Sequence, residues 1–159
     1  MLKVGDKVPV FSLMDTERNE FTNANIEGKI TLFLFFPAAF TSTCTTELCS
    51  VRDDIARYQN LKVQVFGIST DALFTLKKYK EDQHLNFELL SDFNKEVSRS
   101  FDSLYEVFKY NMKGVSKRSA IIINEKGIIQ YIEILENASH VPDFNLINRK
   151  LEEISSIAK

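Results

Sequence analysis

Hydrophobic residues along the chain follow the periods of strands and helices in alternation. Residues 30–36 (ITLFLFF) form an apolar run, rich in β-branched and aromatic side chains, that ends at Pro37. Such a run is typical of a strand buried on both faces in the centre of a sheet. The pattern then predicts a helix over about 43–58, with no Gly or Pro to interrupt it. Its apolar positions recur at spacings of three and four: Leu48, Val51, Ile55 and Tyr58.

The order of a strand followed by a helix repeats in the next segment. Residues 62–70 (KVQVFGIST) alternate in polarity and are rich in β-branched side chains, which predicts a second strand. The segment from Asp71 to about Gln83 then predicts a helix with one apolar stripe. The stripe consists of Leu73, Leu76 and Tyr79. This order is typical of parallel strands joined by crossover helices.

The second half of the chain predicts a weaker strand at 87–90, a short helix at 96–101 and then a hairpin. Two apolar runs, 119–123 and 128–135, flank the turn at 124–127 (NEKG), whose final Gly is a hairpin signal. A closing helix follows, and Pro142 is expected in its first turn, where proline is tolerated. The apolar face of this helix consists of Phe144, Ile147, Leu151 and Ile154.

Together these elements predict an α/β fold of thioredoxin-like type, with a mixed central sheet flanked by helices. The chain has 159 residues, of which 44% are hydrophobic, and it contains no internal repeat or linker-like tract. This length suits one compact domain with a full core. We therefore expect a single thioredoxin-like domain over residues 1–159.

The charge pattern argues against some classes of partner. The 20 basic and 22 acidic side chains nearly cancel and are scattered along the chain, which does not suit nucleic acid or an anionic membrane surface. The first residues (MLKVGDKVPV) lack a signal-peptide run, and the apolar stretch at 30–40 is too short to span a bilayer. We expect a cytoplasmic protein that acts on a small neutral molecule.

The two cysteines are the candidate reactive groups. Cys44 falls in the first turn of the predicted helix, where unpaired backbone N–H groups and the helix dipole favour thiolate over thiol. The alternative is an ordinary buried thiol. The spacing from Cys44 to Cys49 does not suit a Cys-x-x-Cys reductase, and a zinc site would need the distant His84 and His140. We assign these two histidines no chemical role.

Two neighbours of Cys44 can shape its surroundings. Thr41 lies three residues earlier and can place a hydroxyl beside the sulfur, or it can act simply as a helix N-cap. Pro37 can shield a pocket, or it can merely end the strand.

The spacing Pro-x-x-x-Thr-x-x-Cys, read as Pro37, Thr41 and Cys44, resembles the active-site signature of the peroxiredoxins. The similarity extends over nearly the whole chain, through the segments VGDKVPVFSL, GIST with the following Asp71, LLSD and GVSKRSAIIIN. The resemblance implies a thiol peroxidase that needs no metal or organic cofactor. A Cys44 thiolate would attack a peroxide oxygen and become a sulfenic acid.

The resemblance also implies roles for the other residues of the site. Arg118 matches the arginine that the family places beside the reactive sulfur, where it would favour the thiolate and bind the peroxide oxygens. From position alone, an arginine at the start of a strand is a solvated surface charge. Pro37 would shield the pocket and Thr41 would orient the peroxide. Glu47 matches an acidic position of the family and would fix the orientation of Arg118.

Cys49 is the candidate resolving cysteine. In an intact helix, it and Cys44 are separated by about 7.5 Å along the axis, so a disulfide requires the first turns to unwind. A spacing of four intervening residues resembles the bacterioferritin-comigratory or Q type. Residues 36–41 (FPAAFT) instead resemble the alkyl-hydroperoxidase E type, in which an external thiol would resolve Cys44. Cys49 can also be a small apolar helix residue.

The expected partners are a peroxide substrate and thioredoxin or a similar thiol reductant, and the protein is expected to be a monomer or a homodimer. The alternative function is a peroxide sensor or redox relay that passes oxidation from Cys44 to a partner protein. An enzyme would turn over many times with a thiol reductant, whereas a relay would form a mixed disulfide with a specific partner. A third alternative is an inactive thioredoxin-like scaffold, against which the joint presence of Pro37, Thr41, Cys44 and Arg118 argues.

Overall fold

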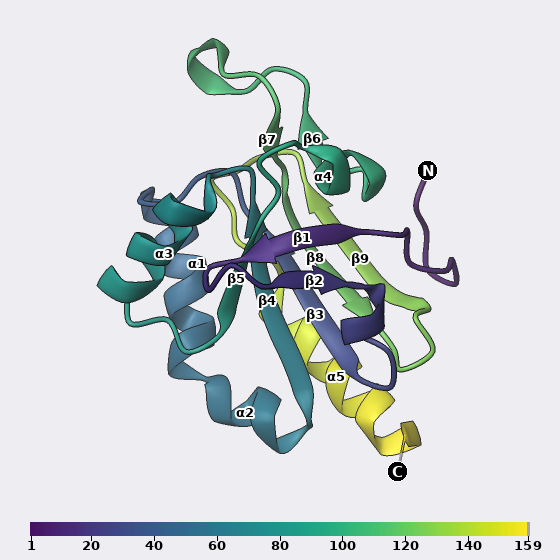
Figure 1. Cartoon of the computed structure of the whole chain (residues 1–159). Coiled ribbons are helices and arrows are strands. Elements are labelled where there is room, and N and C mark those ends of the chain that lie inside the picture. The colour runs from purple at the N-terminus through teal and green to yellow at the C-terminus, as the bar shows by residue number, and fades with distance from the viewer. Residues whose placement is uncertain (159) are drawn as a thin grey trace.

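The computed structural model describes residues 1–158, which form a seven-stranded mixed sheet with helices on both faces (Figure 1). The strand order is β2-β1-β5-β4-β3-β8-β9. Three parallel strands form its centre: β3 (Ile30–Phe35), β4 (Val63–Ser69) and β5 (Glu88–Ser91). The hairpin of β8 (Arg118–Ile123) and β9 (Ile129–Leu135) pairs antiparallel with β3. The predicted mixed sheet flanked by helices is confirmed.

The central strand β3 is buried along its whole length, as its continuous apolar run predicts. Leu32 and Leu34 pack in one core cluster, whereas Phe33 and Phe35 pack in the other. The first cluster includes side chains of the helices α1, α2, α3 and α5, and the second includes the N-terminal segment and α4. The alternation of side chains along β3 thus joins two helical layers to one sheet.

The prediction of one continuous helix over residues 43–58 is wrong in one respect, because the structure has two helices in this region. Helix α1 (Ser42–Asp53) ends where Asp54 leaves helical geometry, with φ −113° and ψ 21°, and α2 (Ile55–Asn60) follows. Asp is a poor helix former because its carboxylate competes for nearby donors. Here the Asp54 carboxylate accepts a hydrogen bond of 2.7 Å from Arg57 Nε.

Helices α3 (Leu73–Asp82) and α4 (Glu96–Ser100) lie close to their predicted positions, and α5 (Phe144–Ala158) closes the chain. The expectation that Pro142 lies in the first turn of the last helix is wrong. The Asp143 carboxylate accepts the Leu146 N–H at 3.1 Å, which is the bond of an N-cap residue, so Pro142 precedes the helix. Within residues 1–158, no helix is long and apolar enough to cross a membrane.

Several short elements are absent from the prediction. The strands β1 (Ser12–Asp15) and β2 (Glu20–Thr22) extend the sheet beyond β5. Two further strands, β6 (Leu104–Tyr105) and β7 (Val115–Ser116), form a separate antiparallel pair. The segment between them projects from one end of the sheet (Figure 1) and contains a 3-10 turn at Lys109–Asn111. A further 3-10 turn lies at Asn23–Asn25.

Candidate active site

The sheet register brings the start of β8 to the end of β3. Phe35, the last residue of β3, pairs with Ser119 of the antiparallel β8. Arg118, the first residue of β8, therefore lies beside the loop that leads from β3 into α1. That loop contains Pro37 and Thr41, and Cys44 is the third residue of α1.

Three side chains meet at this junction. Arg118 Nη2 lies 3.2 Å from Cys44 Sγ, and Arg118 Nη1 donates to Glu47 Oε1 at 2.8 Å. Cys44 and Glu47 are three residues apart, which places both on one face of α1. The three residues are at most 2% exposed. The interpretation of Arg118 as a solvated surface charge is therefore wrong.

The Arg118 guanidinium is held from a second side by a backbone group. The carbonyl oxygen of Ala138 accepts hydrogen bonds from Arg118 Nε at 3.1 Å and Nη2 at 2.9 Å. Ala138 lies in the segment between β9 and α5, and it is buried. Because the guanidinium is planar, partners on both sides fix the direction in which Nη2 points. No residue-type signal in the sequence identifies this carbonyl.

Burial dominates the electrostatics of Glu47. It raises the pKa of Glu47 from 4.5 to about 7, against the opposing charge and hydrogen bond of Arg118. The second carboxylate oxygen, Oε2, is buried without a hydrogen-bond partner among the described residues. For Arg118, burial lowers the pKa, but the charges of Glu47 and Cys44 raise it more, so the guanidinium stays charged.

The sulfur of Cys44 also lies at the positive end of a helix dipole. The Thr45 N–H donates to the Thr41 carbonyl at 3.0 Å and closes the first turn of α1. The N–H groups of the preceding residues of α1, Cys44 among them, come before the first intrahelical hydrogen bond. Both the helix terminus and Arg118 therefore present positive charge to the Cys44 sulfur.

Thr41 and Pro37 occupy the loop on the other side of the cysteine. Thr41 holds the N-cap position of α1, but its hydroxyl donates to the Ala38 carbonyl at 2.7 Å instead of capping the helix. Thr41 is exposed, whereas Pro37 is buried. The loop is fixed by Asp71, whose Oδ2 accepts the Ala39 N–H at 2.9 Å. The sequence pattern assigned Asp71 no role, although Asp71 belongs to the segments that resemble the peroxiredoxins.

Cys49 is half-buried on the α3 side of α1. Its sulfur lies 3.6 Å from Gln83 Oε1, and both cysteines are free thiols. Helix α1 is continuous from Ser42 to Asp53, so both cysteines belong to one unbroken helix. One turn before Cys49, the Thr45 hydroxyl lies 2.8 Å from the Tyr79 hydroxyl of α3.

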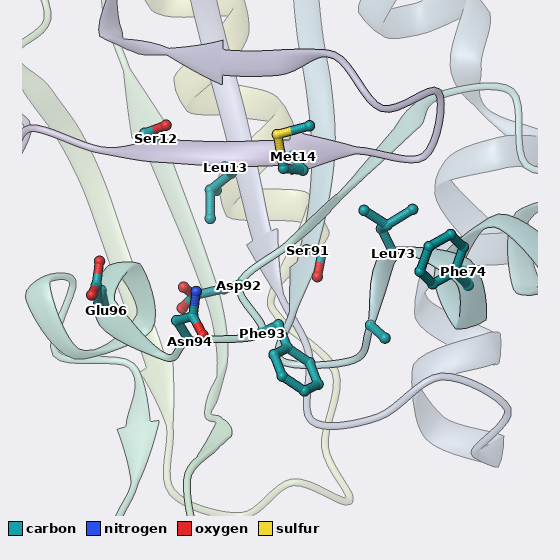
Figure 2. A pocket seen from close by; sticks show the side chains of 11 residues that line it. Ser12, Leu13, Met14, Leu73, Phe74, Ser91, Asp92, Phe93, Asn94 and Glu96 are labelled. Atoms are coloured by element: carbon teal, nitrogen blue, oxygen red, sulfur yellow. The ribbon is translucent and has the colours of Figure 1, made fainter.

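A cavity lies apart from this junction, between β1, the start of α3 and the connection from β5 to α4 (Figure 2). Apolar side chains such as Leu13, Leu73 and Phe93 line it. Two of its polar side chains are engaged within the fold, since Ser91 Oγ donates to the Asp71 carbonyl at 2.6 Å and Asp92 accepts the Ser98 N–H at 2.6 Å. The candidate site residues Pro37, Thr41, Cys44, Glu47, Cys49 and Arg118 are not among its lining residues.

A buried cysteine at a helix N-terminus, beside a buried arginine on a thioredoxin-like sheet, is the kind of site that thiol-dependent redox enzymes use. The chain belongs to the AhpC/TSA family, whose model matches residues 4–132. The prediction of a peroxiredoxin from the sequence is confirmed, and the protein is a thiol peroxidase, which acts on a peroxide and requires a thiol reductant.

Two sequence relatives illustrate the match. Peroxiredoxin Bcp of Escherichia coli is 38% identical over 100 residues, which cover 63% of this chain and 64% of that protein. Alkyl hydroperoxide reductase C of Bacillus subtilis is 30% identical over 156 residues, covering 94% and 81%. Among solved structures, peroxidoxin BcpB from Mycobacterium tuberculosis shares the fold with a TM-score of 0.84 at 24% identity, covering 97% of this chain and 99% of that one.

Proposed function

We propose that Cys44 is the peroxidatic cysteine of this thiol peroxidase. Its thiolate attacks one oxygen of the peroxide, the O–O bond breaks, and the second oxygen leaves with a proton as water or an alcohol. Cys44 becomes a sulfenic acid, so the sulfur is oxidised as the peroxide is reduced. The observation that carries this proposal is the distance of 3.2 Å between Arg118 Nη2 and Cys44 Sγ in a buried site.

In this mechanism Arg118 stabilises charge at two stages. Its guanidinium favours the Cys44 thiolate before the reaction, and its N–H groups bind the leaving oxygen as negative charge develops there. Glu47 fixes one edge of the guanidinium through the 2.8 Å hydrogen bond to Nη1. The Ala138 carbonyl fixes another edge.

We assign the remaining motif residues to the handling of the peroxide. Pro37 is buried next to the reactive loop, and we propose that it excludes water from the sulfur. The exposed Thr41 hydroxyl, held on the Ala38 carbonyl, retains acceptor capacity with which it orients the peroxide O–H.

We propose hydrogen peroxide and organic hydroperoxides as the substrates. Phe40 supports the organic substrates, because its ring is 52% exposed in the loop between Pro37 and Cys44. The ring lies 5.0 Å from that of Tyr79, measured between centroids. An apolar surface at this position gives an alkyl group a place to bind next to the reactive sulfur.

We further propose that Cys49 resolves the sulfenic acid. Its thiolate would attack the oxidised sulfur of Cys44, form the Cys44–Cys49 disulfide and release the oxygen as water. Both cysteines lie in α1, so the helix must unwind before the sulfurs meet. A thioredoxin-like reductant would then return both thiols. Such reductants keep thiols reduced in the cytoplasm, so we infer that the protein acts in that compartment. We expect it to be a monomer or a homodimer.

The test is peroxide oxidation followed by intact-mass measurement under non-reducing conditions. The comparison includes the wild type, Cys44→Ser and Cys49→Ser. Our proposal predicts that the wild type loses two hydrogens in an intramolecular disulfide and that Cys49→Ser stops at the sulfenic acid. Cys44→Ser should not react at low peroxide.

The other outcomes separate the parts of the proposal. Sulfenic and then sulfinic acid in the wild type would contradict the role of Cys49 but leave the role of Cys44 intact. Oxidation of Cys44→Ser at the wild-type rate would contradict the role of Cys44. A mixed disulfide with one protein and no turnover with a thiol reductant would favour the relay.

A further inference from the structure

The Ala138 carbonyl that holds Arg118 lies beyond the end of the sheet. The ladder between β8 and β9 ends at the pair Arg118–Leu135, and residues 136–143 then leave the sheet and lead into α5. A carbonyl in such a segment is fixed only by the contacts that the segment makes with other elements. The orientation of Arg118 therefore depends on what anchors residues 136–138.

Tyr105 of β6 provides an anchor two residues before Ala138. Its hydroxyl donates to the Glu136 carbonyl at 2.8 Å and lies 3.5 Å from the Leu135 carbonyl. A second contact comes from Lys117, whose Nζ lies 2.9 Å from Glu136 Oε1. Because the Glu136 side chain is 78% exposed, the ion pair with Lys117 is the weaker of the two anchors.

The Tyr105 ring is itself held in place. The Phe108 ring lies 4.8 Å away between centroids, and Lys117 Nζ lies 5.6 Å from the Tyr105 centroid on its face. The backbone of Tyr105 is fixed as well, because it pairs with Val115 in β7 and its carbonyl accepts the Gly114 N–H at 3.0 Å. The hydroxyl therefore presents a fixed donor to the segment that leaves β9.

We propose that Tyr105 is a positioning residue of the active site, which acts on Cys44 through Glu136, Ala138 and Arg118. The inference rests on the proposed role of Arg118. Nη2 of Arg118 bonds both the Ala138 carbonyl, at 2.9 Å, and the Cys44 sulfur, at 3.2 Å. A displacement of that carbonyl therefore moves the same nitrogen, and with it the N–H group that points at the sulfur. Small misplacements of this kind reduce rates without any loss of a reacting group.

The test is Tyr105→Phe, which keeps the ring and removes only the hydroxyl. Loss of one such hydrogen bond should lower the second-order rate constant for peroxide by about three- to tenfold. The rate at which iodoacetamide alkylates Cys44 at a fixed pH should also fall, because Arg118 then lies less favourably for the sulfur. Tyr110→Phe is the matched control, since Tyr110 is 92% exposed. Both variants should remain folded at the assay temperature, with Tyr105→Phe losing no more stability than one hydrogen bond contributes.

A double-mutant cycle with Arg118→Lys separates positioning from general damage. The proposal predicts that Tyr105→Phe lowers the peroxide rate in the wild type but adds nothing in Arg118→Lys. An equal loss in both backgrounds would overturn it, as would wild-type rates of peroxide reduction and alkylation for Tyr105→Phe. If Arg118→Lys alone leaves both readouts unchanged, the proposed role of Arg118 fails, and the inference fails with it.

Discussion

Arg118 Nη2 lies 3.2 Å from Cys44 Sγ, although the two residues are 74 positions apart in the chain. The antiparallel pairing of β3 with β8 produces this contact, because it places the start of one strand at the end of the other. A buried cation at this distance favours the thiolate over the thiol far more than an exposed one does. The contact between Arg118 and Cys44 thus depends on the register of β3 with β8, in which Ser119, next to Arg118, pairs with Phe35.

Arg118→Lys tests the geometry of the cation as distinct from its charge. Lysine keeps the positive charge but lacks the planar fork of donors that reaches Cys44, Glu47 and the Ala138 carbonyl in fixed directions. We expect the second-order rate constant for peroxide to fall by about 100-fold, the effect typical of losing one donor that stabilises developing charge. Stopped-flow measurement of peroxide consumption provides the readout. Arg99→Lys, at an exposed position, is the control and should keep the wild-type rate.

Glu47→Gln tests the buried carboxyl group through the pH dependence of stability. The pKa of Glu47 is about 7 in the folded protein and 4.5 for the free side chain, so the folded state retains a proton that the unfolded chain releases between these values. This contribution to stability is complete below pH 4.5 and is lost as the pH rises through about 7. Glutamine does not titrate. The wild type should therefore lose stability relative to Glu47→Gln between pH 5 and 8.

Urea unfolding at four pH values across this range measures the difference. Glu125→Gln, at an exposed position in the β8–β9 hairpin, is the matched control and should follow the wild type at each pH. A constant difference between the wild type and Glu47→Gln would show that the carboxyl group does not titrate in this range.

The sequence predicts β3, α3 and the β8–β9 hairpin because each has a long or regular apolar pattern. It does not predict β1, β2, β6 or β7, which have two to four residues each and are too short to show a period. The break at Asp54 is also missed, because no Gly or Pro marks it. The short strands are fixed by pairing with other strands, whereas the break at Asp54 coincides with a local hydrogen bond from Arg57.

The residues of the candidate site also fall into those that the sequence indicates and those that it does not. Pro37, Thr41 and Cys44 are close in the chain, so their spacing alone indicates a shared loop and helix start. Arg118 is found only through resemblance to a family, because its neighbours in sequence indicate a surface charge. The Ala138 carbonyl is a backbone atom, and a backbone atom carries no residue-type signal. The sequence thus indicates part of the site's chemistry, whereas the site's geometry depends on the pairing of β3 with β8, which are distant in the chain.

Gly67→Ala tests the packing of the sheet behind the active site. A Cβ atom at position 67 would lie 2.7 Å from Leu89 Cδ2 and 3.2 Å from Phe36 Cε1. Both neighbours are fully buried, so they have little room to move. We expect the free energy of unfolding to fall by about 1–3 kcal/mol, as for other overpacked cores, in urea titrations.

The Leu89→Ala background provides the control for this prediction. Removing the isopropyl group of Leu89 creates space for the new methyl group, so Gly67→Ala should cost less stability there than in the wild type. Equal costs in both backgrounds would show that contact with Leu89 is not the cause.

Tyr79→Phe tests the attachment of α1 to α3. The Tyr79 hydroxyl lies 2.8 Å from the Thr45 hydroxyl in the first turns of α1, the part of the helix that must unwind if Cys44 and Cys49 form a disulfide. Loss of this bond should raise the unwound fraction by about three- to tenfold. The disulfide should then form faster, and less Cys44 should pass on to sulfinic acid at high peroxide. Thr45→Val removes the same bond from the other side and should have the same effect.

Intact mass at graded peroxide concentrations gives the ratio of disulfide to sulfinic acid, and hydrogen exchange of the α1 amides measures unwinding independently of the chemistry. Faster exchange without a change in that ratio would mean that unwinding does not limit disulfide formation, and unchanged exchange would mean that the Thr45–Tyr79 bond does not hold the helix.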